Sequence, residues 1–99
     1  MKRTKEMDKL FQAVLTLENI EECYQLFEDI CTIKELEAFV QRFEVAQALD
    51  AGKNYNEVSD NTGASSATIS RVNKCLNYGS GGYRLVLDRL KETEEESNA

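Results

Sequence analysis

Apolar residues recur at helical spacing along almost the whole chain, and the sequence contains no proline. Side chains three, four and seven residues apart fall on one face of an α-helix. The first two apolar stripes consist of Leu10, Phe11, Val14 and Leu15, and of Ile20, Cys23, Tyr24, Phe27 and Ile30. Asn19 stands between them and is suited to cap the second stripe. We therefore predict an all-helical fold that starts with two helices joined tightly.

A capping box marks the start of a third helix. Glu35 follows Thr32 by three residues, so that the hydroxyl can accept from a first-turn amide while the carboxylate accepts from the cap's own amide. The helix should begin at about Ile33 and stop at Gly52, because glycine is common at helix C-termini. Its apolar positions are Leu36, Phe39, Val40, Phe43, Ala46 and Leu49.

Three more helices are predicted in the second half of the chain. Asn54 with Glu57 repeats the capping pattern and opens a short fourth helix to about Asn61, and Ser65 can cap a fifth after the turn Thr62-Gly63-Ala64. The inward positions are Ile69, Val72 and Leu76 in the fifth helix, and Tyr83, Val86, Leu87 and Leu90 in the last.

The glycine-rich stretch "NYGSGGY" separates these last two helices. A phosphate cradle would need a following Lys-Ser/Thr, which is missing, so we interpret the stretch as a helix terminator. The sequence thus predicts one helical domain over residues 1–92, with a helix-turn-helix at about 54–76. Residues 93–99 are expected to form an acidic, disordered tail.

Composition narrows the class of protein. The chain has 99 residues, 41% of them hydrophobic and 30% charged, which is typical of a globular domain. It has neither an apolar run long enough for a membrane span nor the apolar core of a signal peptide, so we expect it in the cytoplasm. The absence of histidine argues against a zinc site, a hydrolase or another enzyme. We expect Cys23, Cys31 and Cys75 to be reduced and mostly buried.

The charge is distributed unevenly along the chain, whose formal net charge is −6. Eleven acids lie from Glu18 to Asp60, against three basic residues, Lys34, Arg42 and Lys53. Between Asp60 and Asp88 there are three basic residues, Arg71, Lys74 and Arg84, and no acid. The second half of the predicted helix-turn-helix is therefore locally positive, as expected for a surface that binds DNA.

A helix-turn-helix template fits this region with Gly63 at the turn, where the motif needs a positive φ. Its inward positions are Val58, Ala64, Ile69 and Val72, all apolar, and the close-approach position holds the small Ser59. The second helix then presents small hydroxyl residues at its leading end and basic residues behind them, an order suited to the major groove. The predicted DNA contacts are Ser65, Ser66, Thr68, Arg71 and Lys74. The alternatives are a capped helix that packs on its neighbour, or a module that binds another protein.

The three N-terminal helices contain more large apolar residues than a domain of this size can cover. We therefore expect a helical homodimer, the alternative being that these residues enclose the core of a monomer.

The region from Phe27 to about Leu90 resembles the Trp repressor superfamily, most closely its YerC/YecD-type branch. "NTGASSATISRVNKCL" is similar to the superfamily's turn and recognition helix, and "SATISR" is the most specific part. The resemblance implies six helices and an intertwined homodimer built from the first three and the last. It also implies a bacterial transcriptional regulator, expected to be a repressor, that binds a palindromic operator.

The same resemblance indicates a candidate effector pocket made of Thr32, Arg42, Arg71, Val72 and Cys75. In tryptophan-responsive members two arginines, matched by Arg42 and Arg71, sandwich the indole. Val72 replaces a glycine and Cys75 a serine of that pocket, so we expect no tryptophan corepressor and no cofactor. The dimer then uses another small-molecule effector or needs none. The two arginines are instead expected to pair with carboxylates such as Glu35 or Asp60.

Overall fold

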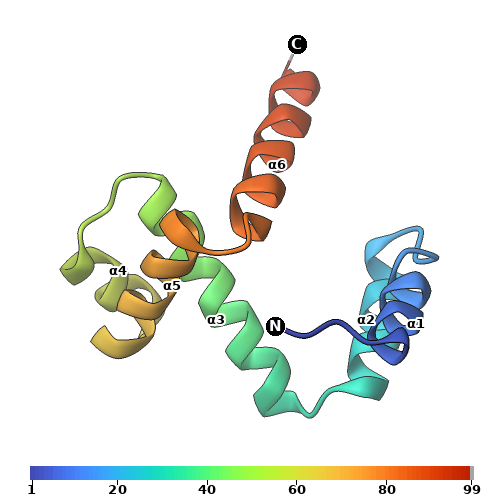
Figure 1. Ribbon diagram of the computed structural model, residues 1–99. Helices are drawn as coiled ribbons and strands as arrows, with labels where there is room; N and C mark the ends of the chain where they lie inside the picture. The colour runs from blue at the N-terminus through green and yellow to red at the C-terminus, as the bar shows by residue number, and fades with distance from the viewer. Residues whose placement is uncertain (99) are drawn as a thin grey trace. The chain divides into compact units, whose positions relative to one another are not determined.

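Six α-helices make up the part of the chain that the computed structural model describes, which is residues 1–98, with side chains through residue 95 (Figure 1). The helices are α1 (Lys5–Val14), α2 (Ile20–Ile30), α3 (Ile33–Asp50), α4 (Tyr55–Thr62), α5 (Ser66–Tyr78) and α6 (Gly82–Asn98). The prediction of an all-helical fold is confirmed, and each of the predicted helices is present.

The contacts divide the chain into two compact units, Met1–Leu36 and Glu37–Ala99. In the first unit, side-chain caps start the helices as the sequence predicts. The Asn19 side chain accepts from the Glu22 amide at 2.9 Å. Thr32 and Glu35 form the predicted capping box, with a 3.1 Å bond to the hydroxyl and a 2.9 Å bond to the carboxylate. The hydrogen bond from the Thr32 backbone amide lowers the pKa of Glu35.

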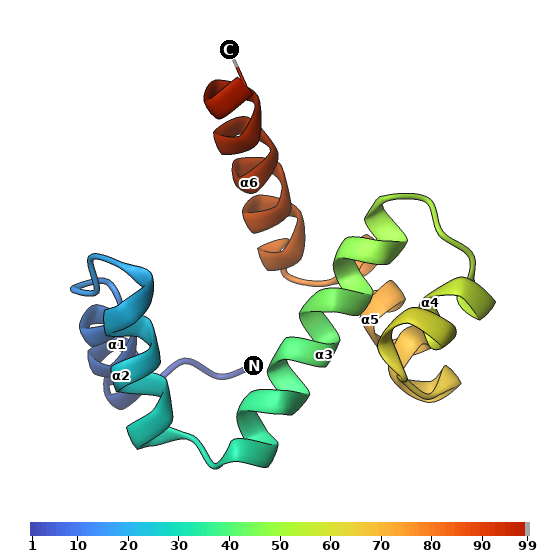
Figure 2. The same ribbon diagram turned by 180° about the vertical axis from the view of Figure 1, so that it is seen from behind.

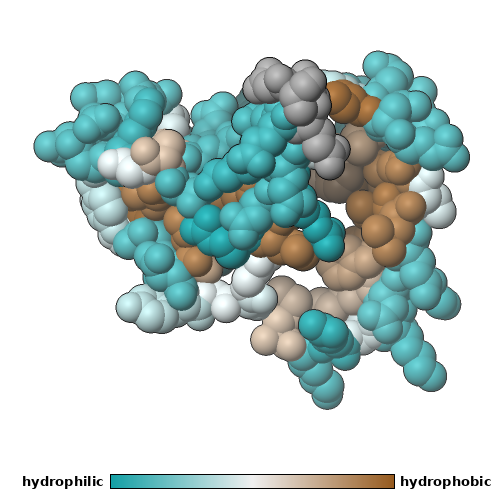
Figure 3. Space-filling model, turned by 90° about the horizontal axis from the view of Figure 1, so that it is seen from above, coloured by the Kyte–Doolittle hydropathy of each residue, from teal (hydrophilic) through white to brown (hydrophobic). Residues whose placement is uncertain are grey.

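Neither α1 nor α2 contains a buried residue. Several large apolar side chains of this unit remain exposed, and apolar surface is visible as brown patches in Figure 3. After Met1, the most exposed of them are Phe11, Leu15, Ile20 and Ile33. An apolar surface that one chain leaves uncovered is typical of a chain that associates with another.

The second unit has its own hydrophobic core, from which water is almost excluded. The core residues are Val45 and Ala46 from α3, Val58 from α4, Ala64, Ile69 and Val72 from the turn and α5, and Leu87 from α6, each at most 4% exposed. Figures 1 and 2 both show α4 and α5 side by side next to the C-terminal half of α3. This core fixes the positions of the two helices on which the candidate site lies.

A cluster of charged side chains joins the end of α3 to α6. Asp50 accepts from Arg84 and from Lys91, both at 2.7 Å, and Arg84 also lies 3.4 Å from Asp88. The hydrogen bonds from Lys91 and Arg84 lower the pKa of Asp50, and the carboxylates of Asp50 and Asp88 raise the pKa of Arg84.

Two expectations about burial differ from the structure. The cysteines are free but not mostly buried, since Cys23 and Cys75 are exposed and Cys31 is half-buried. Val86 and Leu90 are exposed too, whereas Leu87 of α6 is buried in the core of the second unit and Tyr83 packs against that core. Periodicity shows which residues share a face but not whether one chain covers it.

The predicted boundary at residue 93 does not coincide with a helix end. The backbone of α6 continues through Asn98, since glutamate is a good helix former. Ala99 lies outside the described residues. The disorder of the acidic tail and the single domain over residues 1–92 remain predictions.

Candidate nucleic-acid interface

Helices α4 and α5 form a helix-turn-helix around Gly63. Gly63 ends α4 with φ +72°, in the left-handed region that glycine adopts most easily. The four inward positions of the template, Val58, Ala64, Ile69 and Val72, are at most 2% exposed, which confirms the predicted packing of the motif.

Hydrogen bonds hold the turn in one shape. Ser59 Oγ donates to the Ala64 carbonyl at 3.2 Å, across the point where α4 and α5 approach. Thr62 Oγ1 donates to the Val58 carbonyl at 2.7 Å and accepts from the Ala64 amide at 3.2 Å. Gln41 Nε2, on α3, donates to the Thr62 carbonyl at 3.3 Å and ties the turn to that helix. The start of α5 is therefore rigidly placed.

The three hydroxyl residues predicted to contact DNA differ in their hydrogen bonds at the start of α5. Ser65 caps the helix, because its Oγ accepts from the Thr68 amide at 3.2 Å and donates to Thr68 Oγ1 at 3.1 Å. Ser66 is exposed, and its hydroxyl has no hydrogen-bond partner within the described residues. Of the three, Ser66 is the one available to a base edge or a phosphate without loss of the cap.

The exposed face of α5 includes residues that the sequence analysis missed. It lies opposite Ile69 and Val72 and carries, at spacings of three and four, Ala67, Ser70, Arg71, Lys74 and Tyr78, all of them exposed. Ala67, Ser70 and Tyr78 were not among the predicted contacts. The signal was present in the sequence, because the predicted inward residues fix the outward ones through the helical period.

Two of the three predicted local cations are free in the described part of the chain. Arg71 and Lys74 are exposed and form no ion pair there. Arg84, by contrast, is bound to Asp50 and Asp88. The positive charge available on the exposed face of α5 therefore comes from Arg71 and Lys74, in the middle of the helix. The free amides at the N-terminus of α5 also favour phosphate oxygens.

The candidate effector residues have different surroundings. The guanidinium of Arg42 lies 5.8 Å from the centre of the Phe39 ring, a cation–π contact. The predicted pairing of Arg42 and Arg71 with Glu35 or Asp60 is wrong for the described residues, since the Glu35 carboxylate belongs to the capping box and no ion pair involves Asp60. Thr32 caps α3 in the first unit, whereas the other four residues belong to the second.

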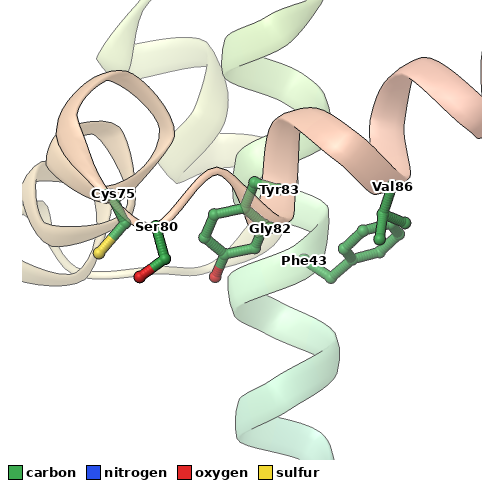
Figure 4. Close-up of a pocket in the computed structure, with 7 residues that line it drawn as sticks. Phe43, Cys75, Ser80, Gly82, Tyr83 and Val86 are labelled. Atoms are coloured by element: carbon green, nitrogen blue, oxygen red, sulfur yellow. The ribbon is translucent and has the colours of Figure 1, made fainter. Parts of the chain in front are cut away.

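A cavity of about 630 Å³ adjoins the end of α5 (Figure 4). It is lined by Phe43 from α3, Cys75 from α5, Gly79 and Ser80 from the loop, and Gly82, Tyr83 and Val86 from α6. Of the candidate effector residues, Cys75 is among those that line it, and the Val72 side chain is in the core. The effector pocket of Thr32, Arg42, Arg71, Val72 and Cys75 remains a prediction.

Comparison with known proteins identifies the family. The model of the family described as Trp repressor protein matches residues 5–91. The chain belongs to the Trp repressor family. Within it, the chain is 53% identical over 97 residues to the uncharacterized protein YerC of Bacillus subtilis (strain 168), covering 98% of this chain and 93% of that protein.

Two crystal structures of the Trp repressor type have the same fold. One is a candidate Trp repressor from Staphylococcus aureus, with a TM-score of 0.87, 46% identity, and coverage of 90% of this chain and 89% of that one. The other is a TrpR-like protein from Eubacterium eligens ATCC 27750, with a TM-score of 0.87, 49% identity, and coverage of 90% and 92%. In residues 1–98 of this family member, no helix is long and apolar enough to cross a membrane.

Proposed function

We propose that the protein is a sequence-specific DNA-binding transcriptional regulator. The observation that carries the proposal is α5: its inward face is buried in the core, and its outward face carries small residues followed by Arg71 and Lys74. A helix of this kind, held by a rigid turn, can enter the major groove and reach base edges with short side chains. The proposed DNA contacts are Ser66, Arg71 and Lys74, with Ser65 and Thr68 at the helix start.

The regulator acts as a homodimer in the bacterial cytoplasm, as a repressor at a palindromic operator. Exposed Phe39 and Val40 on α3 and exposed apolar residues on α6 support the dimer, since one chain leaves them uncovered. Two recognition helices related by a two-fold axis favour two half-sites about 34–36 Å apart, one turn of DNA.

The rival function is a helical module that uses the same motif to bind another protein. Salt distinguishes the two, because DNA binding through phosphates weakens steeply as salt rises, and an apolar protein interface does not. The exposed cations of α5 favour DNA.

Selection of bound sequences from a random DNA library by the purified protein tests the proposal. We expect a shared palindrome, bound with an affinity that falls linearly on a log–log plot against salt. Arg71→Ala should weaken binding and reduce the salt slope by roughly one unit for each phosphate that is no longer neutralised. Arg89→Ala, at an exposed position of α6, serves as the control and should leave both unchanged. Absence of any enriched sequence would overturn the proposal.

A further inference from the structure

Residues 1–9, here called the basic segment, carry a concentration of positive charge that the helix-turn-helix does not use. Four of the twelve basic residues of the chain are in this segment: Lys2, Arg3, Lys5 and Lys9. All four are exposed, and none forms an ion pair with a described residue. Their charge is thus available to a partner.

Two of these cations precede α1 and two share one face of it. Lys2 and Arg3 precede Thr4, the N-cap of α1, in an extended stretch that runs into the helix (Figure 1). Lys5 and Lys9 are four residues apart and share a face of α1. The half-buried Met7 and Val14 lie on the opposite face. The apolar side of α1 can therefore pack while Lys5 and Lys9 remain in water.

The negative charge on the rest of the molecule repels the phosphates of DNA, so additional positive charge would favour binding. The formal net charge is −6, and eleven acids lie between residues 18 and 60. Arg84, on α6, is held by Asp50, and the basic residues on the exposed face of α5 are Arg71 and Lys74. Each phosphate neutralised by a basic side chain releases counterions and adds affinity that does not depend on sequence. The two free cations on each α5 helix supply little of this sequence-independent affinity.

We propose that the basic segment binds the phosphate backbone of DNA and adds a sequence-independent part to the affinity of the helix-turn-helix. This inference rests on the proposed function. DNA is favoured over an anionic membrane because Glu6 and Asp8 lie to either side of Lys5 and Lys9 on α1, which weakens attraction to a uniformly negative surface. Lys2 and Arg3, in the extended stretch before α1, can each bind a different phosphate along the DNA backbone.

The test compares three double variants of the full chain: K2Q/R3Q, K5Q/K9Q and the control K34Q/R89Q. Each removes two positive charges from exposed positions, so the net charge changes equally and only the location differs. Binding to a duplex of about 40 base pairs that carries the selected operator is measured from 50 to 200 mM salt. We expect each basic-segment variant to bind about tenfold more weakly, with a salt slope shallower by roughly 0.9 units for each phosphate left unneutralised. The control should resemble the unmodified protein.

The outcomes separate this inference from the function on which it rests. If the unmodified protein binds no duplex, the proposed function fails and the inference with it. If that protein binds, Arg71→Ala weakens binding, and both basic-segment variants match K34Q/R89Q, only the inference is overturned. Cosedimentation with phosphatidylserine vesicles that is abolished in K2Q/R3Q and K5Q/K9Q, without a change in DNA binding, would also overturn it and assign the segment to a membrane.

Discussion

Arg84 Nη1 lies 2.7 Å from Asp50 Oδ1, and this ion pair joins the first turns of α6 to the last turn of α3. Lys91 reaches the other oxygen of the same carboxylate at 2.7 Å, so that two cations from α6 meet one acid. The helix α6 begins four residues after Tyr78, where α5 ends. The ion pairs that hold α6 to α3 therefore also restrain the C-terminal end of α5. Arg84, which the sequence analysis counted in the locally positive region, therefore joins two helices of the scaffold.

Asp50→Asn should lower the free energy of unfolding by about 1 kcal/mol at neutral pH, since it removes two ion pairs with partly exposed cations. The pKa of Asp50 is lowered from its ordinary 3.8, so its contribution is present above that value and is lost as pH falls through the lower folded-state pKa. Thermal unfolding from pH 7 down to pH 3 should thus show a difference between the two proteins that shrinks at acid pH.

Asp88→Asn is the matched control for Asp50→Asn. The Asp88 carboxylate is 3.4 Å from Arg84 and its side chain is 53% exposed, against 10% for Asp50. The control should change the melting temperature little. An equal loss of stability in both variants would show that Asp50 has no special part in joining the helices.

Gly63→Ala should destabilise the protein by about 1 kcal/mol through the backbone alone, because φ is +72° and an added Cβ would meet no atom within 4 Å. Gly82→Ala is the control: its φ is not in the positive region, and an added Cβ there also meets nothing. Chemical denaturation measures both. A Gly63→Ala protein as stable as the control would contradict the left-handed conformation assigned to residue 63.

Ser65→Ala and Ser66→Ala should separate folding from recognition. Ser65 caps α5, so its replacement should cost about 1 kcal/mol of stability. Ser66 is exposed and makes no such bond, so its replacement should leave stability within about 0.5 kcal/mol. Selection from a random DNA library should show that Ser66→Ala changes the preferred bases. If only Ser65→Ala alters base preference, the assigned roles are reversed.

The sequence predicted the helices and caps well, because those depend on neighbours along the chain. Asn19, Thr32, Asn54 and Ser65 all cap as predicted, and the turn at Gly63 has the expected conformation. What could not be predicted depends on distant residues. The binding of Arg84 to Asp50 joins positions 34 apart, and no local pattern marks it.

The residues of the candidate effector site also show that contacts between distant residues could not be predicted from the sequence. Matching residues to a family's pocket assigns types to positions but not orientations, and Val72 belongs to the core. Likewise the stacking of Arg42 on Phe39 replaces the carboxylate pairing that charge alone suggested.

Phe39→Asp should convert a homodimer into a folded monomer. Phe39 is 46% exposed in the single chain, so an aspartate there stays hydrated in a monomer, but burying it unpaired in an interface costs several kcal/mol, about 2–7 for an uncompensated polar group. Tyr55→Asp, at an aromatic residue 42% exposed on α4, is the control. Sedimentation velocity at micromolar concentration should show dimers for the unmodified protein and the control. A stable unmodified monomer would remove the basis for the dimer.

L-Tryptophan should neither bind measurably nor alter DNA affinity. One face of the Arg42 guanidinium already contacts the Phe39 ring, 5.8 Å from its centre, and an indole between two guanidinium groups would compete for it. Val72, where tryptophan-responsive members are expected to have glycine, is 2% exposed in the core, so the backbone approach that glycine allows is blocked.

Cys75 adds a weaker donor than the serine hydroxyl that the resemblance implies at this position. Repacking around Val72 alone would cost about 1–3 kcal/mol, and each 1.4 kcal/mol is tenfold in affinity, so a micromolar site would move toward millimolar. Calorimetry tests this with the unmodified protein and with Cys75→Ser, which restores the hydroxyl but leaves Val72 and Arg42 in place. Neither should give a saturable signal, whereas one-to-one binding of tryptophan to the unmodified protein in the micromolar range would show that this chain senses the amino acid after all.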